Sequence, residues 1–175
     1  MFDRIDFKDC EILYRESSCT QKEDLLQLKC RNGKLIDVGW YGCENQYCIL
    51  VIENENWDFP CYKIEQQPKL EYIEHHLQKI IDYETTIFTQ PAQILLNKIT
   101  AMIEHWSHSD IHFDRILKPI KQLYVLGLTQ KEVANYIEIY ALKYKDGFDI
   151  RWDLACDILD RVTGFCAPEL RLELK

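Results

Sequence analysis

The sequence has no apolar run that approaches the roughly 18 residues of a membrane-spanning helix, so we expect no insertion into a membrane. It is also poor in basic residues: 21 lysines and arginines stand against 29 aspartates and glutamates, for a formal net charge of -8. Proteins that bind nucleic acids need lysine and arginine for their phosphate contacts, so this deficit argues against that class. Hydrophobic residues fill 47% of the 175 positions, which is enough for a folded core and excludes a disordered chain.

A secretory signal is missing too. Residues 1–6 contain neither a basic segment nor an apolar one, so we expect no signal peptide. The eight cysteines are then not expected to form the disulfide framework of a secreted protein. We predict a cytoplasmic protein with free, largely buried thiols.

Motifs for catalysis and metal binding are lacking as well. There is no G-x-S-x-G, no P-loop and no G-x-G-x-x-G. Zinc modules hold the ion with two close pairs of ligands, and no second close pair follows Cys43 and Cys48. The most metal-like group falls on an expected break between helices: His105, His108, Asp110 and His112. We predict no catalytic residue, metal or cofactor, and keep a metal- or thiol-dependent Cys/His enzyme as an alternative.

Residues 1–88 are expected to form an antiparallel β-meander with a covering helix. Short segments rich in β-forming residues alternate with turns, and Asn32-Gly33 is a strong hairpin signal. The candidate strands are residues 11–15, 25–29, 35–41, 47–52 and 60–65. Apolar residues then recur with helical spacing over residues 69–83, which predicts a helix that covers one face of the sheet.

Residues 89–175 show helical patterns throughout. The expected helices cover residues 91–105, 110–125, 129–143 and 149–162. Thr129 and Glu132 have the spacing of a capping box, and Pro119 is expected to kink or split its helix. The fold class predicted is therefore α+β, with an N-terminal sheet and a C-terminal bundle of about four helices, packed together as one compact unit.

The acidic residues are unevenly distributed. Residues 1–90 hold 17 acids and 10 bases, whereas residues 91–175 hold 12 acids and 11 bases. In the first half, acids surround an aromatic residue in the expected turn at residues 53–58, and an aromatic anchor ringed by charge is typical of interface hot spots. In the second half, four aspartates fall within about 80° of the circumference of the last helix.

Like charges at this spacing destabilise an isolated helix slightly, but they suit docking against a basic protein. The simpler alternative is a solvated surface. We predict that a partner contacts two groups of residues: Glu53, Glu55, Trp57 and Asp58, and then Asp149, Asp153, Asp157 and Asp160.

Three segments resemble bacterial immunity proteins of polymorphic-toxin and contact-dependent growth inhibition systems. They are residues 36–42 (IDVGWYG), 55–60 (ENWDFP) and 162–168 (VTGFCAP), and they follow the same order of meander, helix and helical part. The resemblance implies a cytoplasmic, non-enzymatic inhibitor that binds one cognate toxin domain, often a basic nuclease. A generic adaptor that binds another protein is the remaining alternative.

Overall fold

The computed structural model describes residues 1–18, 20–41, 46–67, 69–106, 113–145, 148–166 and 172. The chain divides into two compact units, Met1–Thr86 and Ile87–Lys175, which we call the N-terminal and C-terminal units. A five-stranded antiparallel sheet comes first and the helical part follows, so the predicted α+β class is confirmed.

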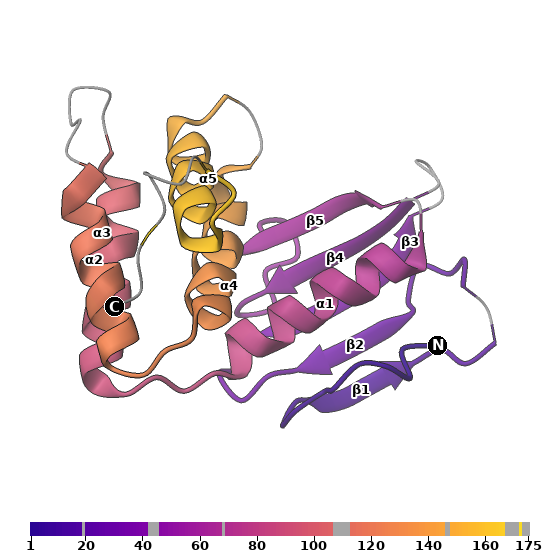
Figure 1. Ribbon diagram of the computed structural model, residues 1–175. Coiled ribbons are helices and arrows are strands. Elements are labelled where there is room, and N and C mark those ends of the chain that lie inside the picture. The colour runs from indigo at the N-terminus through magenta and orange to yellow at the C-terminus, as the bar shows by residue number, and fades with distance from the viewer. Residues whose placement is uncertain are drawn as a thin grey trace. The chain divides into compact units, whose positions relative to one another are not determined.

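The N-terminal unit contains the predicted meander (Figure 1). Its strands lie in the order β1-β2-β3-β4-β5, and each pairs with its neighbour in antiparallel fashion. Their bounds are β1 Glu11–Arg15, β2 Leu26–Lys29, β3 Leu35–Tyr41, β4 Gln46–Ile52 and β5 Tyr62–Gln67. The Asn-Gly turn joins β2 to β3 as predicted, with Gly33 at φ 85°, a left-handed conformation that glycine adopts without strain.

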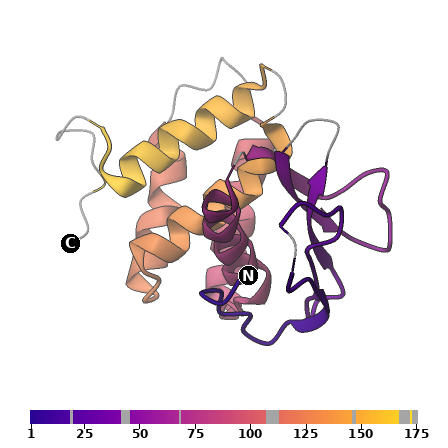
Figure 2. The same cartoon turned by 90° about the vertical axis from the view of Figure 1, so that its right-hand side faces the viewer.

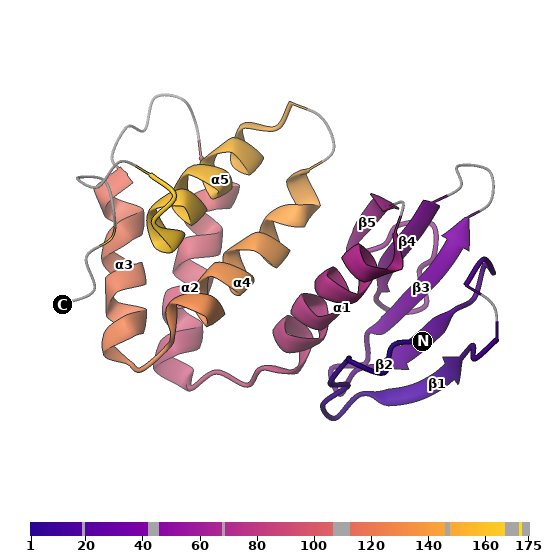
Figure 3. The same cartoon turned by 45° about the vertical axis from the view of Figure 1, so that its right-hand side comes forward.

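Helix α1 (Leu70–Thr85) packs on the apolar face of this sheet. Its Ile73, Leu77, Ile80 and Ile81 are fully buried, which confirms the predicted stripe. Cross-strand pairing aligns the buried residues of the sheet in rows, such as Leu26, Val38, Ile49 and Ile64. Figures 2 and 3 show the helix beside one face of the sheet.

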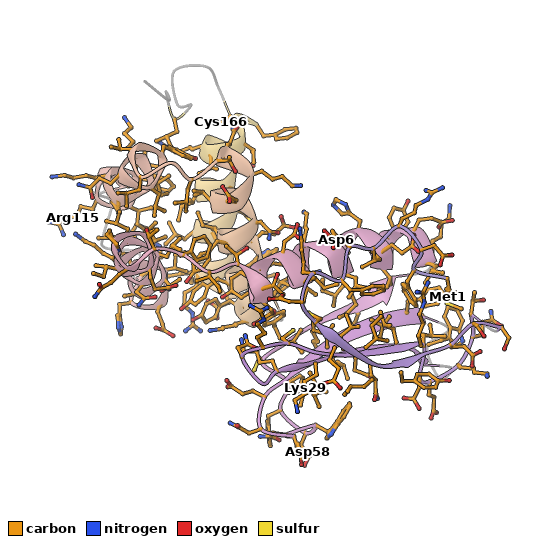
Figure 4. The ribbon with its side chains drawn as sticks, turned by 90° about the horizontal axis from the view of Figure 1, so that it is seen from below. Met1, Asp6, Lys29, Asp58, Arg115 and Cys166 are labelled. Atoms are coloured by element: carbon orange, nitrogen blue, oxygen red, sulfur yellow. The ribbon has the colours of Figure 1, made fainter. Side chains whose placement is uncertain are left out.

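The opposite face of the sheet is partly polar. One cross-strand row on this face runs through Tyr14, Gln27, Asp37, Leu50 and Lys63. Gln27 Nε2 donates a hydrogen bond of 2.9 Å to Oδ1 of the buried Asp37. Figure 4 shows Asp58, in the connection between β4 and β5, on this side of the sheet and away from α1. This face is only partly open to solvent, because Asp37, Cys48 and Ile52 of the central strands are buried on it, whereas Gln27, Leu50 and Lys63 are half-buried.

The first residues of the chain belong to this unit as well. Phe2 is fully buried, and Asp6 exchanges two hydrogen bonds with Gln78 on α1, of 2.8 and 3.1 Å. Arg15 on β1 forms an ion pair of 2.5 Å with Asp3. The contribution of Phe2 to the core had no signal in the hydrophobic periodicity.

The C-terminal unit contains four helices among its described residues, as predicted (Figure 3). They are α2 (Gln90–Glu104), α3 (Phe113–Val125), α4 (Gln130–Ala141), which continues into a short 3-10 turn, and α5 (Ile150–Thr163). The predicted capping box of Thr129 and Glu132 is present at the start of α4. Gly164, at φ 81°, ends α5 in the left-handed conformation that favours glycine at this position.

Two details of this unit differ from the expectation. Pro119 was expected to kink or split α3, and the split is contradicted: the helix runs continuously past it with Ile116 and Ile120 buried on either side. Burial of this face holds the helix together where the proline removes a backbone donor. The helical spacing of residues 91–105 places Ile94 on the apolar side of α2, but Ile94 is 60% exposed, because Leu96 takes the core position instead. The predicted break at residues 107–110 lies outside the described residues.

Candidate functional site

The connection between β4 and β5 carries the first predicted binding group, and we call residues 53–59 the acidic loop. Glu53, Glu55 and Asp58 are all exposed in it, and Trp57 is 48% exposed. The structure therefore brings these four predicted residues together on one short surface segment. The side chains of this group do not belong to the core of the N-terminal unit.

The backbone of the acidic loop has an uncommon conformation. Asn54 and Glu55 have φ values of 55° and 58°, and the Asn56 N–H donates to the Glu53 carbonyl at 3.1 Å. Two successive residues with positive φ are typical of a type I′ hairpin turn. Asparagine tolerates this conformation, whereas at Glu55 it costs about 1 kcal/mol. Strain of this kind concentrates at functional sites, so it supports a role for the loop beyond joining two strands.

Phe59 adds a second aromatic residue to the acidic loop, and the sequence prediction missed it. Its side chain is 78% exposed, more than that of Trp57. The available signal was its position two residues after Trp57, next to Asp58. Two exposed aromatic side chains among three carboxylates combine apolar contact area with negative charge, the combination that a basic protein surface would complement.

Of the second predicted group, Asp149, Asp153, Asp157 and Asp160, only three are exposed. Asp153, Asp157 and Asp160 are exposed on α5, and we call these three the α5 stripe. The opposite side of the helix is buried in the core through Leu154, Ala155, Ile158 and Val162.

Asp149 is not a residue of α5 but its N-cap. Its carboxylate accepts a hydrogen bond of 2.9 Å from the Arg151 backbone N–H and forms an ion pair of 2.5 Å with the Arg151 guanidinium. These hydrogen bonds from Arg151 lower the pKa of Asp149 to about 2. Asp149 therefore serves the start of the helix, and the docking prediction for this surface falls on the three other aspartates.

A buried acidic site that the sequence prediction missed lies at the end of α1. The Glu84 side chain is only 2% exposed, and it accepts hydrogen bonds from Tyr62 Oη at 2.6 Å, Asn32 Nδ2 at 2.7 Å and Lys34 Nζ at 3.0 Å. We call these four residues the Glu84 cluster. Burial, together with the Glu84 carboxylate, raises the pKa of Tyr62 well above its usual value. The cluster ties the last turn of α1 to the β2–β3 turn and to β5, so its role is structural.

Three of the described thiols, those of Cys10, Cys30 and Cys156, do not have the properties of catalytic nucleophiles. Burial raises the pKa of Cys10, Cys30 and Cys156, and nearby carboxylates raise it further, so their thiolate forms are scarce. A cysteine that acts as a catalytic nucleophile at neutral pH needs a lowered pKa. This environment does not favour the thiol-enzyme alternative.

Metal ligands are not grouped in the described part of the chain. No three histidine, cysteine or acidic side chains lie there in an arrangement that could hold a metal ion. Of the metal-like group in the sequence, His105 is exposed at the end of α2, whereas His108, Asp110 and His112 lie outside the described residues, as does Cys43.

Comparison with known proteins adds no relative. No protein-family model matches the chain, and searches of curated proteins and of solved structures find no match either. Within the described residues, none of the helices has both the length and the apolar character to cross a membrane. A function must therefore be argued from the surfaces of the molecule themselves.

Proposed function

We propose that the chain is an immunity protein of a contact-dependent growth inhibition or polymorphic toxin system. In this proposal it acts in the cytoplasm, where it binds and neutralises a cognate toxin domain that is a basic nuclease. The resemblance of three sequence segments to such proteins motivates the proposal, and the acid excess of the chain is compatible with it.

The observation that carries the proposal is the acidic loop. Trp57 and Phe59 expose large apolar side chains beside Glu53, Glu55 and Asp58. Exposed apolar groups rimmed by polar residues mark protein interaction sites, and aromatic anchors dominate their binding energy. The three carboxylates would select a partner surface rich in lysine and arginine.

Such binding explains neutralisation without any chemical step. A nuclease holds nucleic-acid phosphates with lysine and arginine side chains. The carboxylates of the acidic loop would pair with the same cations, while an aromatic ring would fill an adjacent pocket and exclude the substrate. The α5 stripe would contribute a longer-range field that speeds encounter with a basic protein.

Co-expression tests this proposal. The probe is the C-terminal domain of a large secreted protein encoded next to the gene for this chain, produced with and without the full-length chain. We expect the chain to restore growth, and calorimetry with an inactivated form of the domain to show a one-to-one complex of nanomolar affinity.

Two variants with the same change of charge show whether the acidic loop carries the binding. Glu55→Lys should weaken the complex at least tenfold, because the reversed charge sits beside the aromatic anchors. Glu23→Lys is the matched control, an exposed acid elsewhere in the N-terminal unit, and should change affinity much less. Equal effects of the two variants would show that bulk charge, and not the loop, drives binding. A toxic domain that the chain neither binds nor neutralises would refute the proposal.

A further inference from the structure

Two cysteines of the N-terminal unit lie next to each other across adjacent strands. The Sγ atoms of Cys10 and Cys30 are 3.6 Å apart, and both residues are free thiols. Cys10 directly precedes β1 and Cys30 directly follows β2, where Glu11 pairs with Lys29. Continuing this antiparallel register by one residue places the two cysteines opposite each other.

The backbone at this position suits a covalent bond between the two side chains. The Cys10 N–H donates to the Phe7 carbonyl at 3.0 Å and the Cys30 N–H to the Lys34 carbonyl at 2.8 Å, so neither donates to the opposite cysteine. The two Sγ atoms are 3.6 Å apart and must approach to about 2.05 Å for a disulfide, a shift that rotation of the two side chains can supply.

The two thiols differ in their access to solvent. Cys10 is half-buried, whereas Cys30 is only 2% exposed. A small oxidant therefore reaches Cys10 first, and Cys30 is the neighbour that can react with the product. Burial disfavours both thiolates most, and the negative charge of Glu84 adds to this effect, whereas Lys34 favours the Cys30 thiolate; the thiols therefore remain protonated and their oxidation is slow at neutral pH.

We propose that Cys10 and Cys30 form a modification site at which hydrogen peroxide or a related peroxide produces a cross-strand disulfide. The Cys10 thiolate attacks a peroxide oxygen, the O–O bond breaks, and the second oxygen leaves as water after protonation, so that Cys10 becomes a sulfenic acid. The Cys30 thiolate then attacks the Cys10 sulfur. The S–S bond forms, the S–O bond breaks and a second water leaves. Each sulfur loses one electron, and the peroxide is reduced to two waters.

The disulfide would fix the outer strand of the sheet. All five side chains of β1 are exposed, and its only strand partner among the described residues is β2. The bond closes the chain between residues 10 and 30, which removes conformations from the unfolded state. For a loop of this length, the equilibrium constant for unfolding should fall on the order of a hundredfold. This inference does not depend on the proposed function.

Peroxide treatment of the full-length chain tests the site. The remaining thiols are alkylated under denaturing conditions, and the peptides are mapped by mass spectrometry without reduction. We expect a peptide pair that links Cys10 to Cys30, formed faster as the pH rises from 7 to 9, and reverted by dithiothreitol. Urea unfolding of the oxidised chain should show the corresponding gain in stability.

Three variants complete the test. Cys10→Ser and Cys30→Ser should both lose the linked peptide and the stability gain, while urea unfolding of the reduced proteins verifies that they fold. Cys156→Ser is the matched control: Cys156 is also half-buried with a raised pKa but belongs to the C-terminal unit, so this variant should keep both effects. A map in which Cys10 and Cys30 remain alkylatable, or in which they link to other cysteines instead, would overturn the proposal.

Discussion

Two groups of acids at the same end of one sheet have opposite environments. Leu35 pairs with both Lys29 and Ile52, so the β2–β3 turn and the acidic loop leave the sheet at the same end. On the side of α1, Glu84 is buried and satisfied by three neighbouring side chains. In the acidic loop, Glu53, Glu55 and Asp58 are exposed beside two exposed aromatic residues.

This difference separates an acid that the fold requires from acids that the fold does not use. A buried carboxylate is tolerated only where donors replace its hydration, so Glu84 is tied to its neighbours. Exposed carboxylates need no such partners, and their removal leaves no buried group unsatisfied. Position in the sequence and residue type do not distinguish the two cases; burial and hydrogen bonding do.

The largest expected effect follows from removing the buried charge. Glu84→Gln should destabilise the N-terminal unit by about 3 kcal/mol, because Lys34 loses its counter-charge in a largely buried position. Urea unfolding measures this change. Glu55→Gln, which removes the same charge from the acidic loop, should change stability by no more than about 0.5 kcal/mol. Equal losses of stability in the two variants would show that the buried and the exposed acid contribute equally to the fold, contrary to this prediction.

The second largest effect is expected in the exposed acidic loop. Trp57→Ala should leave the unfolding midpoint unchanged but weaken binding of the co-expressed toxin domain by about 2 kcal/mol or more, as expected for an aromatic hot spot. Phe59→Ala should act in the same direction. Calorimetry on the variant and the parent chain gives the two affinities. Loss of stability without loss of affinity would assign Trp57 to the fold instead.

A smaller effect is expected from the α5 stripe, which has charge but no aromatic residue among its three members. Reversal of all three charges, in Asp153→Lys/Asp157→Lys/Asp160→Lys, should weaken the complex by about 1 kcal/mol at low salt. It should also reduce the dependence of affinity on salt, because exposed charges act mainly through association rate. Unchanged affinity and salt dependence would mean that the stripe is a solvated surface.

The smallest effect concerns Asp149, the acid that caps α5. Its pKa is about 2 in the folded chain against an ordinary 3.8, so the interaction stabilises the fold above about pH 4 and is lost as the pH falls towards 2. Asp149→Asn retains a capping side chain but lacks the charge. The stability difference between parent and variant should therefore shrink between pH 4 and 2.

Much of the fold was predictable, because the periodicity of apolar residues and the residue types that form turns and caps are local features of the sequence. The alternating strands, the Asn-Gly turn, the stripe of α1 and the capping box of α4 each lie within a short window of sequence. The predictions were wrong or incomplete where tertiary contacts determine the local structure. Pro119 lies in an unbroken helix because its neighbours are buried, and Phe2 enters the core from a segment without any periodicity.

The candidate site was predictable in part for the same reason. The acids around Trp57 are close in sequence, so their grouping could be predicted, although their role in binding stays a prediction. Phe59 was missed because the expected turn ends at residue 58, although its position beside Asp58 and near Trp57 was an available signal. Glu84 and Asn32 are 52 residues apart, and Cys10 and Cys30 are 20 apart, so only the register of the strands and the packing of α1 bring these groups together.

The conformation of the acidic loop also affects how its surface can change in evolution. Its turn is defined by the backbone at Asn54 and Glu55, and the side chains of residues 53–59 are all exposed. Most substitutions there would not disturb the packing beneath. Under the proposed function, the acidic loop could therefore change one residue at a time to follow a changing partner, while the sheet that supports it stays the same.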